Sequence, residues 1–345
     1  MNTTTRTFYL PRLEDTFSVF PDNGLNPHYA ECRIQSQAWI DKYYKIVCGP
    51  KMRAYMDHCK FELITAYTYP YASSDGLRKT MDLANILWLY DEFTDTLSGK
   101  DATNAAAIVI RTLRERDFDD GSWICHMMRD FYAAHIEKFG PNVSRRFIDH
   151  FCQYVEGTGT EAKHREKDHV LDINAYIIMR RAASAVLTAF DLAEYCLGID
   201  LPQYVHDDPA FISGYNAGLD LVFLDNDLFS YDMEQAKGHC TTNIITVVMK
   251  SKRIDLQSAF DFTAGYCESL TQQLIAAQIS LASRTDPVFS NNAVKCLEAI
   301  ANWVKGSDGW SFATERYFGK QNVIVKETRA VEMRKSFQDI AVLKE

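Results

Sequence analysis

The chain has 345 residues, of which 47% are hydrophobic and 12% aromatic, a composition typical of a globular protein with a large core. Its formal net charge is −9 and no basic block interrupts it, which argues against nucleic acid or an acidic membrane as a partner. Nine cysteines are scattered without a CxxC pair, a pattern that favours reduced, buried thiols over disulfides or zinc sites.

Targeting and membrane segments are not evident in the sequence. The first residues, MNTTTRTFYLPRLEDTF, lack the apolar stretch of a signal peptide and the basic leader of a transit peptide. No apolar run approaches the roughly 18 residues that a membrane span needs. Proline is scarce, and no Pro-, Gly- or Ser-rich linker divides the chain. We therefore expect a soluble, cytoplasmic protein with one domain over residues 1–345.

Apolar residues recur at three- and four-residue spacing along most of the chain, which predicts an all-α fold of about a dozen helices around one core. Strand-like alternation is rare, and no repeat of fixed period occurs. The predicted helices cover residues 29–47, 52–66, 76–97, 102–116, 122–138, 142–158, 172–197, 208–236, 242–250, 255–282, 287–304 and 323–340.

The helix predicted over 76–97 carries a first acidic cluster near its end. Asp91 and Asp95 are four residues apart, so both project from one face, about 6 Å apart along the axis. Like charges so placed repel each other, and a bound cation would relieve the repulsion. Glu92 points about 100° away and is expected to support the pair. Acidic pairs at this spacing are common, so this cluster alone is weak evidence for a metal site.

The second cluster lies in the sequence NDLFSYDMEQAK. Asn226, Ser230 and Glu234 follow one another at four-residue spacing and form a stripe of hard oxygen ligands, which suits Mg²⁺. Lys237, about one turn further on, suggests an anion bound beside the metal. Asp227 lies off the stripe and is expected to support it by hydrogen bonds. The alternative is a solvated helix face, because these residue types are common on surfaces.

Both clusters follow apolar, partly aromatic helix segments. If the two helices lie side by side, their polar ends form the rim of a deep apolar cavity. Mg²⁺ usually binds substrate phosphates together with a few carboxylates. The pattern therefore predicts a ligand with a phosphorylated head and a hydrocarbon tail.

The motifs DEFTD and NDLFSYDME resemble the aspartate-rich and (N/D)DxxSxxxE metal motifs of microbial class I terpene cyclases. Two further features are similar to that family. Arg180 stands 46 residues before Asn226 (226 − 180 = 46), where the family has an arginine that senses diphosphate, and Arg316 and Tyr317 form an Arg-Tyr pair near the C-terminus. The form DExTD, with TAYTYPYAS upstream, looks most like the fungal sesquiterpene synthases.

This resemblance extends over nearly the whole chain, and it implies a single-domain class I terpenoid synthase bundle that cyclises farnesyl diphosphate to a sesquiterpene. It implies three Mg²⁺ ions, whose ligands here are Asp91, Asp95, Asn226, Ser230 and Glu234. Diphosphate would be bound by Arg180, Lys237, Arg316 and Tyr317. Closure of loops around 236–242 and 306–320 would then exclude water, which would otherwise quench the cation.

The cavity below the metals is expected to hold the hydrocarbon. Trp88 and Phe223 lie about one turn before the two motifs, Trp310 is a candidate lid, and Ser184 follows the sensor arginine by four residues. Aromatic faces stabilise a cation by about 0.5–2 kcal/mol each. The alternative for each aromatic is ordinary core packing. Diphosphate itself can accept the final proton, so no dedicated general base is expected.

Some departures and alternatives stay open. Ala183 stands where bacterial members often have an aspartate, and Arg181 is an alternative sensor if the helix register is shifted. The DExTD group is associated with 1,11-closure to a humulyl-type cation and protoilludene-like products. Ten- or twenty-carbon substrates are alternatives to the fifteen-carbon one.

Two other classes of protein compete with a cyclase. A chain-elongating prenyl transferase would share the fold, but its second DDxxD motif is absent from this sequence. A non-catalytic helical scaffold would leave the acidic stripes facing solvent. His164 and His169, in the polar run 160–169, are expected in a solvated loop, and His239 and Cys240 in a mobile loop beside the second motif.

Overall fold

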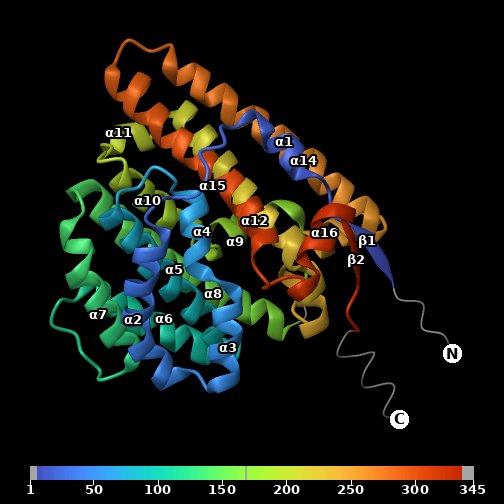
Figure 1. The fold of residues 1–345 in the computed structure, drawn as a ribbon, viewed down its shortest axis with the longest axis horizontal. Coiled ribbons are helices and arrows are strands. Elements are labelled where there is room, and N and C mark those ends of the chain that lie inside the picture. Colours follow the sequence, from blue (N-terminus) through green and yellow to red (C-terminus); the bar gives the residue numbers. More distant parts are fainter. Residues whose placement is uncertain (1–5, 168, 336–345) are drawn as a thin grey trace.

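The structure, a computed structural model, describes residues 6–167 and 169–335 and confirms the predicted all-α fold (Figure 1). The elements of the N-terminal half are β1 (Thr7–Tyr9), α1 (Leu13–Thr16), η1 (Phe17–Val19), α2 (Tyr29–Val47), α3 (Pro50–Cys59), α4 (Phe61–Thr68), α5 (Ser74–Thr94), α6 (Gly99–Arg114), α7 (Trp123–Ala134), η2 (Ile136–Lys138) and α8 (Pro141–Glu166).

The described residues of the C-terminal half are also almost entirely helical, and the last element among them is the second short strand. Its elements are α9 (Ile173–Ala183), α10 (Val186–Cys196), α11 (Gln203–His206), α12 (Pro209–Lys237), η3 (Cys240–Thr242), α13 (Ile244–Lys252), α14 (Leu256–Ala282), η4 (Val288–Ala293), α15 (Val294–Ala313), η5 (Gly319–Gln321), α16 (Asn322–Thr328) and β2 (Ala330–Glu332).

Two predicted helices are each broken into two by a residue in the left-handed region. The helix expected over 52–66 ends at Cys59, and Lys60 (φ 50°) separates it from α4. The helix expected over 172–197 stops at Ala183, and Ala185 (φ 60°) begins α10 in a new direction. L-residues adopt this conformation rarely, and neither position carries the glycine that would have marked it in the sequence.

The ends of other helices also differ from expectation. α8 continues through Glu166, so most of the polar run expected as a loop is helical. α15 continues to Ala313, so 306–313 is helix rather than loop. The helix expected over 323–340 is wrong beyond Thr328, because the chain turns at Arg329 (φ 61°) into β2; the residues after 335 lie outside the described part of the chain.

The long helix α12 runs through the middle of the bundle, between α14 on one side and α15 on the other (Figure 1). α5, α8, α9, α10 and α15 join it around a central space. α2 and α6 pack outside this ring, against α5 and α8, and α7 packs on α6. No helix in the described part of the chain combines the length and the apolarity that crossing a membrane requires.

Close helix contacts at two glycines bring the walls of the central space together. A Cβ atom on Gly157 of α8 would lie 2.9 Å from the backbone of Ala183 at the end of α9. A Cβ atom on Gly306 of α15 would lie 2.6 Å from the carbonyl oxygen of Tyr67 in α4. Since backbone atoms cannot yield as a side chain would, glycine is needed where these helices cross.

The two short strands form an antiparallel pair that joins the ends of the described chain, with Phe8 opposite Val331. Phe8 is buried, stacks on Phe260 of α14 at 4.5 Å and meets Tyr231 of α12 edge-on at 6.0 Å. Gln257 of α14 bonds both the amide nitrogen and the carbonyl oxygen of Tyr9. The strand pair is therefore fastened to the outside of α12 and α14.

Candidate active site

All the site residues that the sequence predicts line one pocket in the centre of the bundle. Its empty space, including the part open to solvent, is about 1420 Å³. Acidic and basic side chains gather at one end, and apolar side chains from α5, α10, α12 and α15 form the remainder of the wall. The structure thus brings the two motifs together, as expected from the sequence, while the chemical roles of these residues stay predictions.

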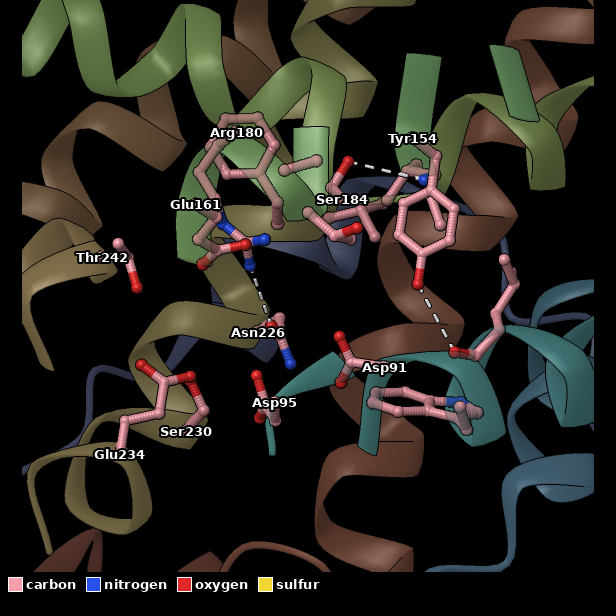
Figure 2. A pocket seen from close by; sticks show the side chains of 18 of the residues that line it. Asp91, Asp95, Tyr154, Glu161, Arg180, Ser184, Asn226, Ser230, Glu234 and Thr242 are labelled. Atoms are coloured by element: carbon pink, nitrogen blue, oxygen red, sulfur yellow. Dashed lines mark hydrogen bonds between the residues drawn. The ribbon is translucent and has the colours of Figure 1, made fainter. Parts of the chain in front are cut away.

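Asp91 and Asp95 enter the pocket from the last turn of α5 (Figure 2). Burial, and after it repulsion from Asp95 and Glu92, raises the pKa of Asp91 to about 8. Arg165 of α8 contacts the Asp95 carboxylate at 3.2 Å. Glu92 is not among the residues that line the pocket, and it accepts a hydrogen bond from Arg316 at 2.9 Å.

Asn226, Ser230 and Glu234 face the α5 carboxylates from α12 (Figure 2). Burial, and after it the charge of Asp227, raises the pKa of Glu234 to about 7. The amide of Asn243, the N-cap residue of α13, donates to Glu234 Oε2 at 3.0 Å and to the Asp227 carbonyl at 2.8 Å. A residue that no sequence motif singles out therefore fixes the end of the stripe.

Arg180, from α9, is held across the top of the stripe. Its guanidinium donates to Asp227 Oδ1 at 2.8 Å and to Asn226 Oδ1 at 3.2 Å. Asp227 also accepts hydrogen bonds from the Tyr176 hydroxyl and from the Ile244 amide, so its expected supporting role is confirmed by its contacts. These contacts fix both the position and the charge of the arginine beside the stripe.

Arg181, the alternative sensor, points elsewhere. It forms two hydrogen bonds of 2.7 Å with the carboxylate of Asp220, on the side of α12 away from the pocket lining. Arg180 is therefore the arginine of this pair that faces the pocket. Ser184 also lines the pocket, at the break between α9 and α10.

Arg316 and Tyr317 lie between the two metal motifs. Arg316 is buried, donates to Glu92, and has its guanidinium carbon 4.1 Å from the ring centroid of Trp88. Asn226 Nδ2 donates to the Tyr317 hydroxyl at 2.8 Å. Burial raises the pKa of Tyr317 to about 12, so its hydroxyl keeps its proton at neutral pH. The Arg-Tyr pair thus bridges α5 and α12.

The aromatic residues form the wall beneath this rim. Trp88 stacks on Phe61 at 4.5 Å, and Phe223 lies 5.8 Å from the guanidinium carbon of Arg180. Trp310, expected as a lid, is instead a fixed part of the wall: it is buried, and its Nε1 donates to the Lys60 carbonyl at 3.2 Å. The lid expectation failed because α15 continues past this residue.

One wall of the pocket, which α8 supplies, was not predicted from the sequence. Tyr154, Thr158, Glu161 and Arg165 all line it, and Figure 2 shows Tyr154 and Glu161 directed into it. Burial raises the pKa of Glu161, with the charges of Arg180 and Arg165 acting against that rise. Their spacing of three and four residues was a visible helical signal, but Glu161 and Arg165 belong to the polar run 160–169, which was interpreted as a solvated loop.

His239 and Cys240 lie between α12 and α13, beside the second motif, and the mobility expected for this segment stays a prediction. His239 lines the pocket mouth with Lys237, which ends α12. Thr242, in η3, lines the pocket too. His164 and His169 lie on the outside, with their Nδ1 atoms 3.1 Å apart; His164 belongs to α8, so the solvated-loop expectation is wrong for it.

The donor set fits a hard divalent cation. Carboxylates from α5 face an amide, a hydroxyl and a carboxylate from α12, and all of them present oxygen. The raised pKa values of Asp91 and Glu234 show that the protein alone compensates these buried charges incompletely. A cation between the two faces would supply the missing charge.

Comparison with known proteins agrees with this geometry. The family described as terpene synthase family 2, C-terminal metal binding, matches residues 82–273, which include both acidic motifs. The chain is 61% identical over 340 residues to a sesquiterpene synthase of Sphaerobolus stellatus, a match that covers 99% of this chain and 98% of the relative.

Two relatives carry more specific names. A viridiflorene synthase of Cyclocybe aegerita is 49% identical over 334 residues, covering 95% of this chain and 86% of the relative. A Delta(6)-protoilludene synthase of Stereum hirsutum is 31% identical over 329 residues, covering 94% of this chain and 87% of the relative.

Solved structures show the same fold at lower identity. A hedycaryol synthase in complex with HEPES superposes with a TM-score of 0.74 at 22% identity, covering 89% of this chain and 98% of that one. The family match over more than half of the chain and the near-complete alignment with the relative of 61% identity carry the assignment. The chain belongs to terpene synthase family 2 and is an enzyme of the terpene synthase class.

Proposed function

We propose that this terpene synthase ionises farnesyl diphosphate in the presence of Mg²⁺ and cyclises the resulting cation to a sesquiterpene, with release of diphosphate. The observation that carries the proposal is the pocket itself. Oxygen ligands and cationic donors converge at its rim, and tryptophan, phenylalanine and aliphatic side chains form its wall. A prenyl diphosphate has the same division between a charged head and an apolar tail. The sesquiterpene synthase of Sphaerobolus stellatus supports the fifteen-carbon chain length.

The diphosphate head would meet donors that already have fixed positions. Arg180 is held by Asp227, and Arg316 is held by Glu92. Burial opposes the charge of both arginines, but their neighbours outweigh it and keep each pKa well above its ordinary value: Asp227 first for Arg180, and Tyr55 and then Glu92 for Arg316. Preorganised cations stabilise developing negative charge without the cost of reorganising at the moment of reaction. Two further donors to the diphosphate would be Lys237, at the end of α12, and the hydroxyl of Tyr317, which follows α15.

The residues that would hold Mg²⁺ are Asp91, Asp95, Asn226, Ser230 and Glu234. Bound Mg²⁺, in the three ions that the family resemblance implies, would neutralise the diphosphate and so favour its departure as an anion. Asn226 and Glu234 are already oriented by Arg180, Tyr317 and Asn243.

The hydrocarbon would lie against the aromatic wall below the rim. Trp88, Phe223 and Trp310 face this space, and each can stabilise a nearby carbocation by about 0.5–2 kcal/mol without bonding to it. Ser184, Val186 and Ala189 shape the opposite side, where α9 breaks into α10. Segment 238–243, between α12 and α13, contributes His239 and Thr242 to the pocket lining and would exclude water on closing.

The identity of the product is the most specific part of the proposal. The DExTD motif points to 1,11-closure and a protoilludene-like hydrocarbon, and a protoilludene synthase is among the relatives at 31% identity. A viridiflorene synthase at 49% identity supplies the competing product. We keep 1,11-closure as the hypothesis to be tested.

The test is incubation of the purified protein with geranyl, farnesyl or geranylgeranyl diphosphate, with Mg²⁺ or with EDTA, followed by gas chromatography–mass spectrometry. We expect a fifteen-carbon hydrocarbon from farnesyl diphosphate that disappears with EDTA. Products from the ten- or twenty-carbon substrate alone would overturn the substrate assignment. Longer prenyl diphosphates formed with isopentenyl diphosphate would favour a prenyl transferase, and silence with every substrate would overturn the proposal.

A further inference from the structure

Arg334, just after the end of β2, makes four contacts that the activity described above does not use. Its backbone amide donates to Asp232 Oδ1 at 2.7 Å, and its Nε lies 3.1 Å from Asp232 Oδ2. Its carbonyl oxygen accepts from Gln235 Nε2 at 2.9 Å. Its Nη2 donates to the carbonyl oxygen of Tyr317. One residue near the end of the described chain thus joins the last turns of α12 to the Arg-Tyr segment.

Asp232 makes this link specific rather than incidental. Its side chain is 3% exposed, although it stands on α12 between Ser230 and Glu234. Both of its oxygens are contacted by Arg334. A buried carboxylate needs such partners, because leaving it without them carries a large desolvation cost. The Asp232–Arg334 contact therefore fixes the guanidinium at one place on α12.

Tyr317 is consequently held at both of its ends. Its hydroxyl bonds Asn226 at 2.8 Å, and its carbonyl bonds Arg334, which is fixed to Asp232. If Asn226 turns to bind a metal ion, the hydroxyl loses that partner. The contact from Arg334 then remains to hold Tyr317 and the adjoining Arg316 over the stripe.

Arg334 is itself anchored from outside the pocket. It follows β2, which pairs with β1, and β1 is stacked on α14 through Phe8 and Phe260 and bonded to Gln257. The other end of the Arg-Tyr segment is held separately, by Thr314 Oγ1 donating to the Cys59 carbonyl at 2.6 Å. The side chain of Arg334 thus connects the strand pair to the Arg-Tyr segment directly, in addition to the intervening η5 and α16.

We propose that Arg334 is a positioning residue, which sets the place of the Arg316–Tyr317 pair by tying the Tyr317 carbonyl to Asp232 of α12. The kinetic part of this inference rests on the proposed function. If the pair contacts the leaving group as charge develops on it, displacing the pair reduces the stabilisation of the transition state. The binding of the substrate is reduced less. Small displacements of a positioned group are costly, and the loss can reach about a hundredfold.

Arg334→Ala removes the link, and Arg334→Lys keeps the charge but has no planar fork that reaches Asp232 and Tyr317 together. We expect kcat with farnesyl diphosphate to fall about tenfold in Arg334→Ala, with KM changed less than about threefold, and to recover in part in Arg334→Lys. Gln257→Ala is the matched control, because it removes only the two bonds to Tyr9 and leaves in place the Phe8–Phe260 stack and the contacts of Arg334. It should keep the kcat of the unaltered chain.

Hydrogen exchange in the ligand-free protein tests the link whatever the substrate is. Arg334→Ala should exchange faster at residues 314–319, whereas Gln257→Ala should exchange faster only within the strand pair, at residues 7–9 and 330–332. Unchanged exchange at 314–319 in Arg334→Ala would overturn the inference, as would a kcat loss that Gln257→Ala reproduces. An unaltered chain without activity on any prenyl diphosphate would overturn the proposed function instead, and the exchange result would still decide the role of Arg334.

Discussion

The two acidic faces of the pocket are held in different ways. On α12, Asn226 is bonded to Arg180 and Tyr317, and Glu234 is bonded to Asn243. On α5, the principal partner of Asp95 is Arg165, and Asp91 has a pKa raised to about 8 by burial and neighbouring carboxylates.

The ends of the two helices accentuate this contrast. α5 ends at Thr94, so both aspartates lie at its C-terminus, where the helix dipole disfavours negative charge. α12 has Lys237 in its last turn, where the dipole favours positive charge. The protein itself thus orients the α12 side chains, whereas a bound cation would compensate the charge of the α5 carboxylates.

The largest effect is expected from removing an α12 ligand. Glu234→Gln or Asn226→Leu should lower turnover of farnesyl diphosphate by at least about a hundredfold, because charge stabilisation at the leaving group would be lost. Steady-state assays measure the loss, and circular dichroism should show unchanged helix content. Near-normal turnover in both variants would remove the stripe from the site.

A paired substitution sharpens the comparison between the faces. Asp227→Asn should destabilise the ligand-free protein by on the order of 3 kcal/mol, because Arg180 would lose its buried partner. Asp91→Asn should stabilise it by at least about 0.5 kcal/mol, because it removes the cost of burying this acid and, after that, its repulsion from Asp95 and Glu92. Denaturant unfolding measures both changes. If both substitutions changed the free energy of unfolding in the same direction, the contrast between the α5 and α12 faces would be contradicted.

The floor of the pocket, which is the apolar end that Trp303 lines, should govern the product ratio more than the rate. Trp303 lines the pocket about 10 Å below Trp310 along α15 and meets Tyr69 edge-on at 5.4 Å. Trp303→Phe should alter the product ratio and allow some turnover of geranylgeranyl diphosphate, while farnesyl turnover falls less than about tenfold. Product analysis as above measures this. An unchanged product profile would exclude the floor as a determinant.

The smallest effect concerns pH and a buried acid outside the pocket. Burial, and after it the charge of Glu14, raises the pKa of Asp308 to about 7 from an ordinary value of 3.8. The folded state therefore binds the proton more tightly, and the stability this adds is lost as pH rises from about 4 to 7.

Asp308→Asn removes that loss of stability. The difference in melting temperature between the variant and the unaltered chain should therefore increase from pH 5 to pH 8. Thermal denaturation across this range measures the difference. Asp117→Asn, at an exposed position, is the control and should show no such trend. If the difference in melting temperature for Asp308→Asn does not change with pH, the raised pKa of Asp308 would be contradicted.

The sequence predicted the fold well where periodicity was unbroken. The expected helix over 29–47 coincides with α2, and that over 208–236 nearly coincides with α12. The prediction failed at Lys60 and Ala185, because a left-handed residue that is not glycine gives no local sign of a helix break in the sequence. Such breaks depend on packing against the rest of the chain.

For the site, the sequence was strong where chemistry follows helix spacing and weak where it depends on tertiary contacts. The stripe from Asn226 to Glu234 could be predicted from four-residue spacing. Glu161 and Arg165 were missed because their charged run was taken for solvated surface, and Asn243 because its contact with Glu234 forms only on folding. Trp310 was misplaced because the end of α15 was predicted too early.

Calorimetric titration with Mg²⁺ and inorganic diphosphate shows whether the two acidic faces form one binding site. We expect tight diphosphate binding to the unaltered chain only with Mg²⁺ present, and its loss in both Asp91→Asn and Glu234→Gln. Diphosphate binding that persists in either variant, or that ignores Mg²⁺, would contradict a shared site between α5 and α12.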